Sequence, residues 1–273
     1  MRKYKFADYF YPSDKRKLLE FINWAYSKAE VGNEAAEAKA YVAPHAGYSY
    51  SGVIAAYTYK ALLMKKDLDK LDTIIIIGPN HTGLGEAVSI SKEDWETPFG
   101  VYKNDIELSL EIGKKDSMSI DEEAHKEEHS IEVQLPFLDS LRDTKKFCFI
   151  CMGDQSLEYS QKLAEAIVNS AAKLNRNITV IASSDFNHYE AASIASEKDG
   201  KLLEALQNID YKSFNKLVEE TADTICGFGP ITVALLFAKS RNARKGVILK
   251  YGNSGDTTGE YESVVAYASI AFV

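Results

Sequence analysis

The sequence predicts one α/β domain with a mostly parallel central sheet and helices on both faces. Two observations lead to this class. Short apolar runs alternate along the chain with helix-length segments, a pattern that implies parallel strand pairing. The 273 residues contain no linker, repeat or low-complexity stretch, and 45% of them are apolar. We therefore expect a single domain over residues 1–273, built around one large core.

Six segments are predicted as strands. The clearest is 73–77, because its Thr-Ile-Ile-Ile-Ile sequence is β-branched throughout and suits a strand buried on both faces. The others are 40–43, 147–152, 178–182, 247–251 and 264–272. The region 86–102 contains Trp95, Pro98 and Gly100, and we expect it to form an insertion or an antiparallel edge.

Helices are predicted between these strands. In the first, Ser13 is the expected N-cap, apolar residues recur at helical spacing from Leu18 to Ala29, and 32–33 (Gly-Asn) end the helix. Five more helices are expected at 52–64, 106–112, 157–174, 197–206 and 231–239.

Composition argues against several classes of protein. The formal net charge is −8 and no Lys/Arg-rich stretch occurs, so we expect no nucleic-acid partner. No apolar run is long enough for a membrane helix, and residues 1–10 lack the apolar core of a signal peptide. Three cysteines are too few for a disulfide scaffold. The expectation is a reduced, cytoplasmic protein without membrane partners.

Histidines and aspartates follow the predicted strands at once. His45 and His81 come after the first two, Asp154 after the third, and Asp185 and His188 after the fourth. Parallel strands bring their carboxyl ends to one edge of the sheet, where α/β proteins bind ligands. One such histidine would more often stabilise a turn, but three at one edge favour a site. His45 and His81, in short Pro/Gly loops, are the best metal-ligand candidates.

Cys226 is the candidate for a third ligand. It precedes Pro230, which fits the first position of the helix predicted at 231–239. A cysteine near a helix N-terminus is favoured as thiolate, and a thiolate can bind iron, copper or zinc. The alternative is an inert buried thiol.

Cys148 and Cys151 are predicted to be core residues rather than a metal or redox pair. Both lie inside an apolar strand, and residues three apart on a strand face opposite sides. The loop 252–259 lacks the Gly-Lys-Ser/Thr of a phosphate-binding loop and is expected to be a turn.

His125 and His129 have the four-residue spacing of a zinc-protease helix. The match fails because Lys126 stands where that motif needs glutamate. We expect the acidic stretch 121–128 to be a solvated loop or a helix start. His129 and Glu132 either support the site from behind its ligands or form a structural or exposed pair.

Several long motifs, running from near residue 40 to the C-terminus, resemble the Memo family. They are Ala43-Pro-His45-Ala-Gly-Tyr-Ser-Tyr-Ser-Gly52, Gly78-Pro-Asn-His81, Glu128-His129-Ser-Ile-Glu132-Val-Gln-Leu-Pro136-Phe, Ser184-Asp185-Phe-Asn-His188, Cys226-Gly-Phe-Gly-Pro230 and Gly252-Asn-Ser-Gly-Asp256.

The resemblance implies the fold of class III extradiol dioxygenases, which bind non-haem iron(II) with two histidines and a carboxylate. It makes His45 and His81 ligands, puts Cys226 in place of the carboxylate, and gives His188 the acid/base role. A thiolate at that position shifts preference toward copper or zinc and puts ring cleavage in doubt. Iron(II) is our first expectation, then copper, then zinc. Microbial members of the family are described as companions of radical-SAM proteins, and the eukaryotic member as a signalling and cell-motility mediator.

Three functions follow as hypotheses. The first is a metal-dependent redox enzyme with metal on His45, His81 and Cys226, in which His188, oriented by Asp185, moves protons. The second is a binding module for a peptide or small ligand, walled by aromatic residues: Tyr48, Tyr50, Trp95 and Phe186. The third is a metal-free hydrolase or transferase with Cys226 as nucleophile and His188 as base.

Overall fold

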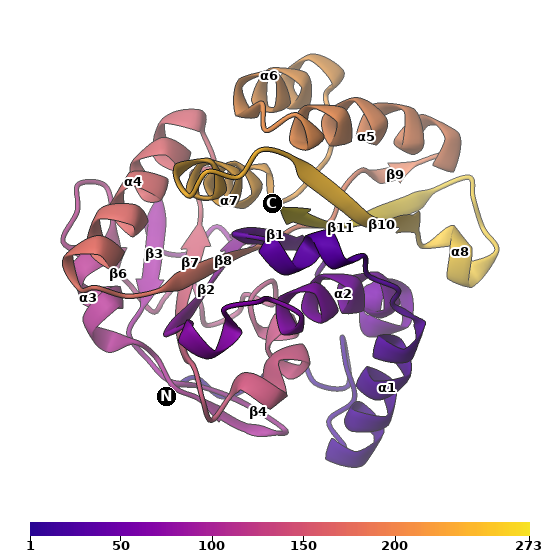
Figure 1. The fold of residues 1–273 in the computed structure, drawn as a ribbon. Coiled ribbons are helices and arrows are strands. Elements are labelled where there is room, and N and C mark those ends of the chain that lie inside the picture. Colours follow the sequence, from indigo (N-terminus) through magenta and orange to yellow (C-terminus); the bar gives the residue numbers. More distant parts are fainter.

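Nine strands form one mixed sheet through the middle of the molecule in the computed structural model, which describes residues 1–273 (Figure 1). Their order is β10-β11-β1-β8-β2-β7-β3-β6, and β9 pairs with β11. The four central strands are parallel, as predicted. They are β1 (Ala40–Ala43), β8 (Ile178–Ser183), β2 (Thr73–Pro79) and β7 (Lys146–Met152).

Both edges of the sheet contain antiparallel pairs. β10 (Gly246–Asn253) and β11 (Val264–Phe272) run antiparallel to each other, and β11 runs antiparallel to β1 and β9 (His188–Glu190). Parallel pairing of β10 with β11 would require a long crossover, but only the one-turn helix α8 (Gly255–Thr258) separates them.

The region 86–102 contributes to the other edge of the sheet. Its first part is β3 (Val88–Ser91), which is antiparallel to β7 and parallel to β6 (Ser119–Ile120). The remainder is a separate hairpin of β4 (Trp95–Thr97) and β5 (Gly100–Tyr102). The region is thus partly an edge and partly an insertion.

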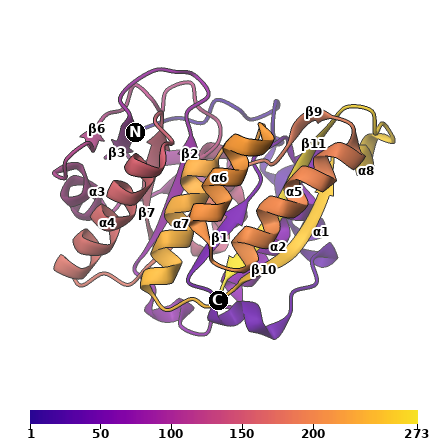
Figure 2. The same cartoon turned by 90° about the horizontal axis from the view of Figure 1, so that it is seen from above.

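Helices cover both faces of the sheet. One face carries α1 (Lys15–Lys28), α2 (Tyr48–Leu63) and the 3₁₀ helix η3 (Glu132–Leu141), with short 3₁₀ turns at Asn33–Glu37 and Leu68–Lys70. On the other face α4, α7, α6 and α5 lie side by side, with α3 beside α4 (Figure 2). Their bounds are α3 Ile106–Gly113, α4 Leu157–Lys173, α5 Ala192–Gln207, α6 Tyr211–Thr221 and α7 Phe228–Ser240.

One local prediction needs correction, and two helical segments were not predicted. The N-cap of α1 is Asp14, whose side chain accepts a hydrogen bond from Lys17 N, whereas Ser13 donates its hydroxyl to Asp8. The amphipathic helix α6 was missed. The segment 132–141 forms a 3₁₀ helix that includes Pro136.

The core consists of one apolar cluster on each face of the sheet. Cys148 belongs to one cluster and Cys151 to the other, which confirms their prediction as core residues on opposite faces. Of the four aromatic residues considered as pocket walls, Tyr48, Trp95 and Phe186 are buried, and only Tyr50 is exposed. None of the helices has the length and apolarity to cross a membrane.

Candidate metal centre

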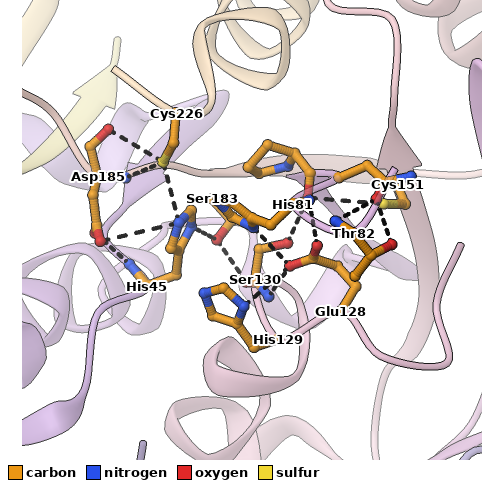
Figure 3. A network of polar contacts seen from close by, with 12 residues as sticks. His45, His81, Thr82, Glu128, His129, Ser130, Cys151, Ser183, Asp185 and Cys226 are labelled. Carbon is orange, nitrogen blue, oxygen red and sulfur yellow. Dashed lines mark hydrogen bonds and ion pairs between the residues drawn. The ribbon is translucent and has the colours of Figure 1, made fainter. Parts of the chain in front are cut away.

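Three histidines meet at the carboxyl edge of the parallel strands. His45 follows β1 and His81 follows β2, as predicted, and His129 reaches them from the segment before η3 (Figure 3). Each offers a ring nitrogen within 4.8 Å of the nitrogens of the other two. Gly78 in β2 permits this approach, because a Cβ there would collide with the Ser130 side chain.

The protonation of His45 follows from its hydrogen bonds. Ser183 at the end of β8 donates its only hydroxyl proton to Ser130 O at 2.6 Å and accepts from Gln134 Nε2 at 2.7 Å. The third contact of this hydroxyl, 2.9 Å to His45 Nδ1, therefore needs a proton on Nδ1. This leaves the lone pair of His45 on Nε2. The ring is buried, and burial, followed by the nearby His81, holds the pKa of His45 well below its usual value.

Glu128 gives His81 the same tautomer. The ring nitrogen Nδ1 of His81 lies 2.9 Å from Glu128 Oε1, and a carboxylate can only accept, so Nδ1 carries the proton. Glu128 also accepts from His81 N at 2.6 Å and Ser130 N at 2.8 Å. Burial alone would raise the pKa of Glu128, but its hydrogen bond and charge interaction with His81 lower it to about 2.

Glu128 was missed in the sequence. The stretch 121–128 was expected to be a solvated loop or helix start, but Ala124, His125 and Glu128 are buried. Its buried residues 124, 125 and 128 have the spacing of a helix face, but the segment forms turns. The available signals were its position beside His129 and its place at the start of the motif that runs from Glu128 to Phe137.

The ring of His129 is stacked between the rings of Phe10 and His81. It stacks on Phe10 with 4.5 Å between centroids and on His81 with 4.7 Å. Its Nδ1 is 3.3 Å from Glu128 Oε1. Burial, followed by the nearby His45, lowers the pKa of His129 to about 3. His45 and His129 are thus neutral at physiological pH and have lone pairs to offer a cation.

Cys226 lies beside His45, just before α7. Its Sγ is 3.1 Å from His45 Nε2 and accepts a hydrogen bond from Asp185 N at 3.2 Å. It does not join the mutually close group that the three imidazoles form. A helix N-terminus was expected to favour the thiolate, but burial, with the Asp185 charge adding to it, raises the pKa of Cys226 well above its usual value. The ligand role of Cys226 stays a prediction.

The side chain of Asp185 orients the loop of His45 by binding the backbone N–H groups of that loop. Its buried carboxylate accepts from His45 N at 2.8 Å and Ala46 N at 3.3 Å. Burial raises the pKa of Asp185 despite the bond from His45 N.

The other two predicted residues do not reach the three imidazoles directly. His188 begins the short edge strand β9, where its backbone N donates to Thr224 and its Nδ1 is buried without a partner. Glu132 hydrogen-bonds to the N-terminal segment and to none of the histidines. The roles predicted for both remain untested.

The donor set fits a transition-metal ion. Metal-bound histidines usually donate their second ring N–H to a carboxylate or another acceptor, which is how Ser183 holds His45 and Glu128 holds His81. Neutral imidazoles suit iron, copper and zinc. The exposed side-chain fraction rises from 3% for His45 to 34% for His81, so one side of the cluster is open to solvent.

The fold and site define an α/β protein with a candidate metal centre at the carboxyl ends of its parallel strands. A family model described as Memo-like protein matches residues 2–271. The chain therefore belongs to the Memo-like family.

Curated relatives of the same family are similar to this chain along nearly its whole length. A MEMO1 family protein of Saccharolobus islandicus is 42% identical over 279 residues, covering 97% of each chain. One from Methanopyrus kandleri is 39% identical over 276 residues, covering 97% of this chain and 96% of the relative. One from Sulfolobus acidocaldarius is 40% identical over 280 residues, covering 97% of each.

Proposed function

We propose that this protein binds one divalent transition-metal ion on His45, His81 and His129 and uses it in redox chemistry on a small molecule. The observation that carries the proposal is the convergence of three imidazole donors, two of them with tautomers set by Ser183 and Glu128. Three protein ligands leave coordination positions for a substrate or water.

Iron(II) is the metal that we propose first, then copper, then zinc. All three accept imidazole donors. Cys226 and His188 support the choice of a redox-active ion in this proposal. The Cys226 thiol can be oxidised and the His188 imidazole can carry protons, and both residues lie near the same edge of the sheet. A bound iron or copper ion would supply electron transfer and activation of oxygen at the open positions.

The protein's own groups would orient the reactants and move protons. Asp185 holds the His45 loop through two backbone N–H groups, and Glu128 fixes the ring of His81. In our proposal His188 acts as the acid/base, and its Nδ1 has no hydrogen-bond partner within the protein.

A cavity near the site, lined by none of the three histidines, offers space for a substrate. Its volume is about 650 Å³, within the usual range for small-molecule sites. Asn80, the residue before His81, lines it together with Gln155, whose amide donates to Cys226 O. A radical-SAM partner stays a prediction from the family resemblance, and a cytoplasmic location stays a prediction from the composition.

Elemental analysis of protein purified without a chelating tag tests the proposal. We expect about one equivalent of metal in the wild type and almost none in a His45→Ala/His81→Ala variant. His125→Phe is the matched control, because His125 is buried outside the cluster, and it should keep full occupancy. Equal metal content in the wild type and the double variant would overturn the proposal.

The geometry of Cys226 leaves a metal-free thiol enzyme as a second candidate. Its Sγ pairs with His45 Nε2 at 3.1 Å rather than with His188. The raised pKa of Cys226 argues against an activated nucleophile. If a thiol-reactive probe labels Cys226 no faster than the buried Cys148, this candidate is excluded.

A further inference from the structure

Glu132 is a fully buried carboxylate whose partners all come from the first eleven residues. It accepts from Phe6 N at 2.8 Å, Tyr11 Oη at 2.8 Å and Arg2 Nη1 at 2.6 Å, and Lys5 N lies 3.0 Å from its Oε1. Because four donors of the N-terminal segment bind this one carboxylate, Glu132 is the main anchor of residues 2–11.

Arg2 connects this anchor to the loop that carries His129. Besides Glu132, the guanidinium donates to His125 O at 2.6 Å and Glu128 O at 2.8 Å. It also lies over the Trp95 ring at 4.1 Å. The N-terminal segment and the loop 125–132 are therefore fastened together on both sides of His129.

The anchored segment places two aromatic rings against the site. Phe10 stacks on the face of His129 away from His81, and Phe6 meets the same imidazole edge-on at 5.7 Å between centroids. Phe10 is fixed in turn, since its carbonyl accepts from Tyr48 N at 2.7 Å. Of the three histidines, only His129 has its orientation set by stacking rather than by a short hydrogen bond from its ring.

We propose that Glu132 is a positioning residue of the metal centre. By anchoring residues 2–11, it holds Phe10 against His129 and keeps that imidazole aligned with His45 and His81. This inference rests on the proposed function, because it names Glu132 as the residue that keeps the third proposed ligand, His129, in position. The segment also forms a wall of the site, so its release opens the His129 side to solvent.

Two readouts of Glu132→Gln test this role. The first is the NMR signal of the His129 ring protons in metal-free protein, which the Phe10 ring current shifts upfield. We expect that shift to be lost while the His45 signals stay in place. The second is the rate at which a chelator removes cobalt(II), which should rise about tenfold or more. Glutamine keeps the shape but turns an amide toward Arg2 and the backbone donors.

Controls separate positioning from stability alone. Phe10→Leu keeps the anchor but removes the stacked ring, and should reproduce both effects. Glu111→Gln breaks another buried carboxylate cluster, in which Glu111 on α3 pairs with Lys114 just after that helix and with Lys173 at the end of α4, and it should change neither readout. If Glu132→Gln does not fold, Tyr11→Phe, which removes one of its donors, should give a smaller change in the same direction.

Unchanged His129 signals in Phe10→Leu and in the folded anchor variant would overturn the inference. Because the NMR readout uses metal-free protein, it decides this point even if the wild type binds no cobalt. Failure of the wild type to bind cobalt would count against the proposed function instead.

Discussion

Two fully buried carboxylates show opposite behaviour in two regions of the molecule. Glu128 lies among the histidines and faces His81, His129 and backbone N–H groups, and its pKa falls to about 2. Asp199 lies on α5, where it accepts from Tyr251 Oη at 2.7 Å, and its pKa rises to about 7. Burial pushes both pKa values upward.

The difference comes from the neighbours. Asp199 has a hydroxyl and a long contact from Asn187 N, with the carboxylates of Asp223 and Glu190 nearby. Glu128 has three short contacts to donors. The comparison shows that the surroundings of Glu128 stabilise a negative charge next to the three histidines, whereas the surroundings of Asp199 on α5 favour a protonated carboxyl group.

Removing Glu128 should have the largest effect. Glu128→Ala leaves the two N–H groups of His81 and that of Ser130 without an acceptor. It should destabilise the metal-free protein by roughly 3 kcal/mol or more and weaken metal affinity by about 10- to 100-fold. Urea denaturation and chelator competition measure the two quantities. Glu127→Ala is the control, since its exposed pair with Lys5 should matter by less than about 1 kcal/mol. Similar losses in both variants would contradict the account.

Asp199→Asn should stabilise the protein in a pH-dependent way. The folded-state pKa of Asp199 lies above its unfolded value, so its contribution is most favourable below pH 3.8 and is lost as the pH rises to about 7. Asparagine keeps the shape and removes the titration. We expect a gain of roughly 2–4 kcal/mol at pH 8 and little at pH 4.

Denaturation of wild type and variant at both pH values measures that gain. Asp116→Asn serves as the control, because this carboxylate is almost fully exposed. A gain that is equal at pH 4 and pH 8 would contradict a raised pKa of Asp199 in the folded protein.

Ser183→Ala tests the tautomer of His45 and should have a smaller effect. The change removes the acceptor of His45 Nδ1 and of Gln134 Nε2. Metal affinity should fall by about tenfold and stability by roughly 1–2 kcal/mol. Isothermal titration with zinc(II) reads the affinity. Unchanged affinity would show that Ser183 does not set the tautomer.

Cys226→Ser should have the smallest effect on metal binding. If three imidazoles hold the ion, serine should change the affinity by no more than about threefold, whereas loss of a thiolate ligand would cost far more. Competition with a chromophoric chelator distinguishes the two cases.

The sequence was informative where local pattern decides the structure. The β-branched run of β2 and the Pro/Gly loops after β1 and β2 predicted the parallel core and the meeting of His45 and His81. The predictions failed where residues far apart in the sequence determine whether a side chain is buried. Glu128 is buried because Arg2 and His81 cover it, from 126 and 47 residues away. The same long-range packing brings His129 to the site and places the Cys226 thiol beside His45 and Asp185, where its pKa is raised.

X-ray absorption at the edge of the bound metal tests the central claim most directly. The account predicts three imidazole nitrogens around the ion and no sulfur among its ligands. Two imidazoles with a sulfur at about 2.3 Å would contradict it, and would make Cys226, rather than His129, the third ligand.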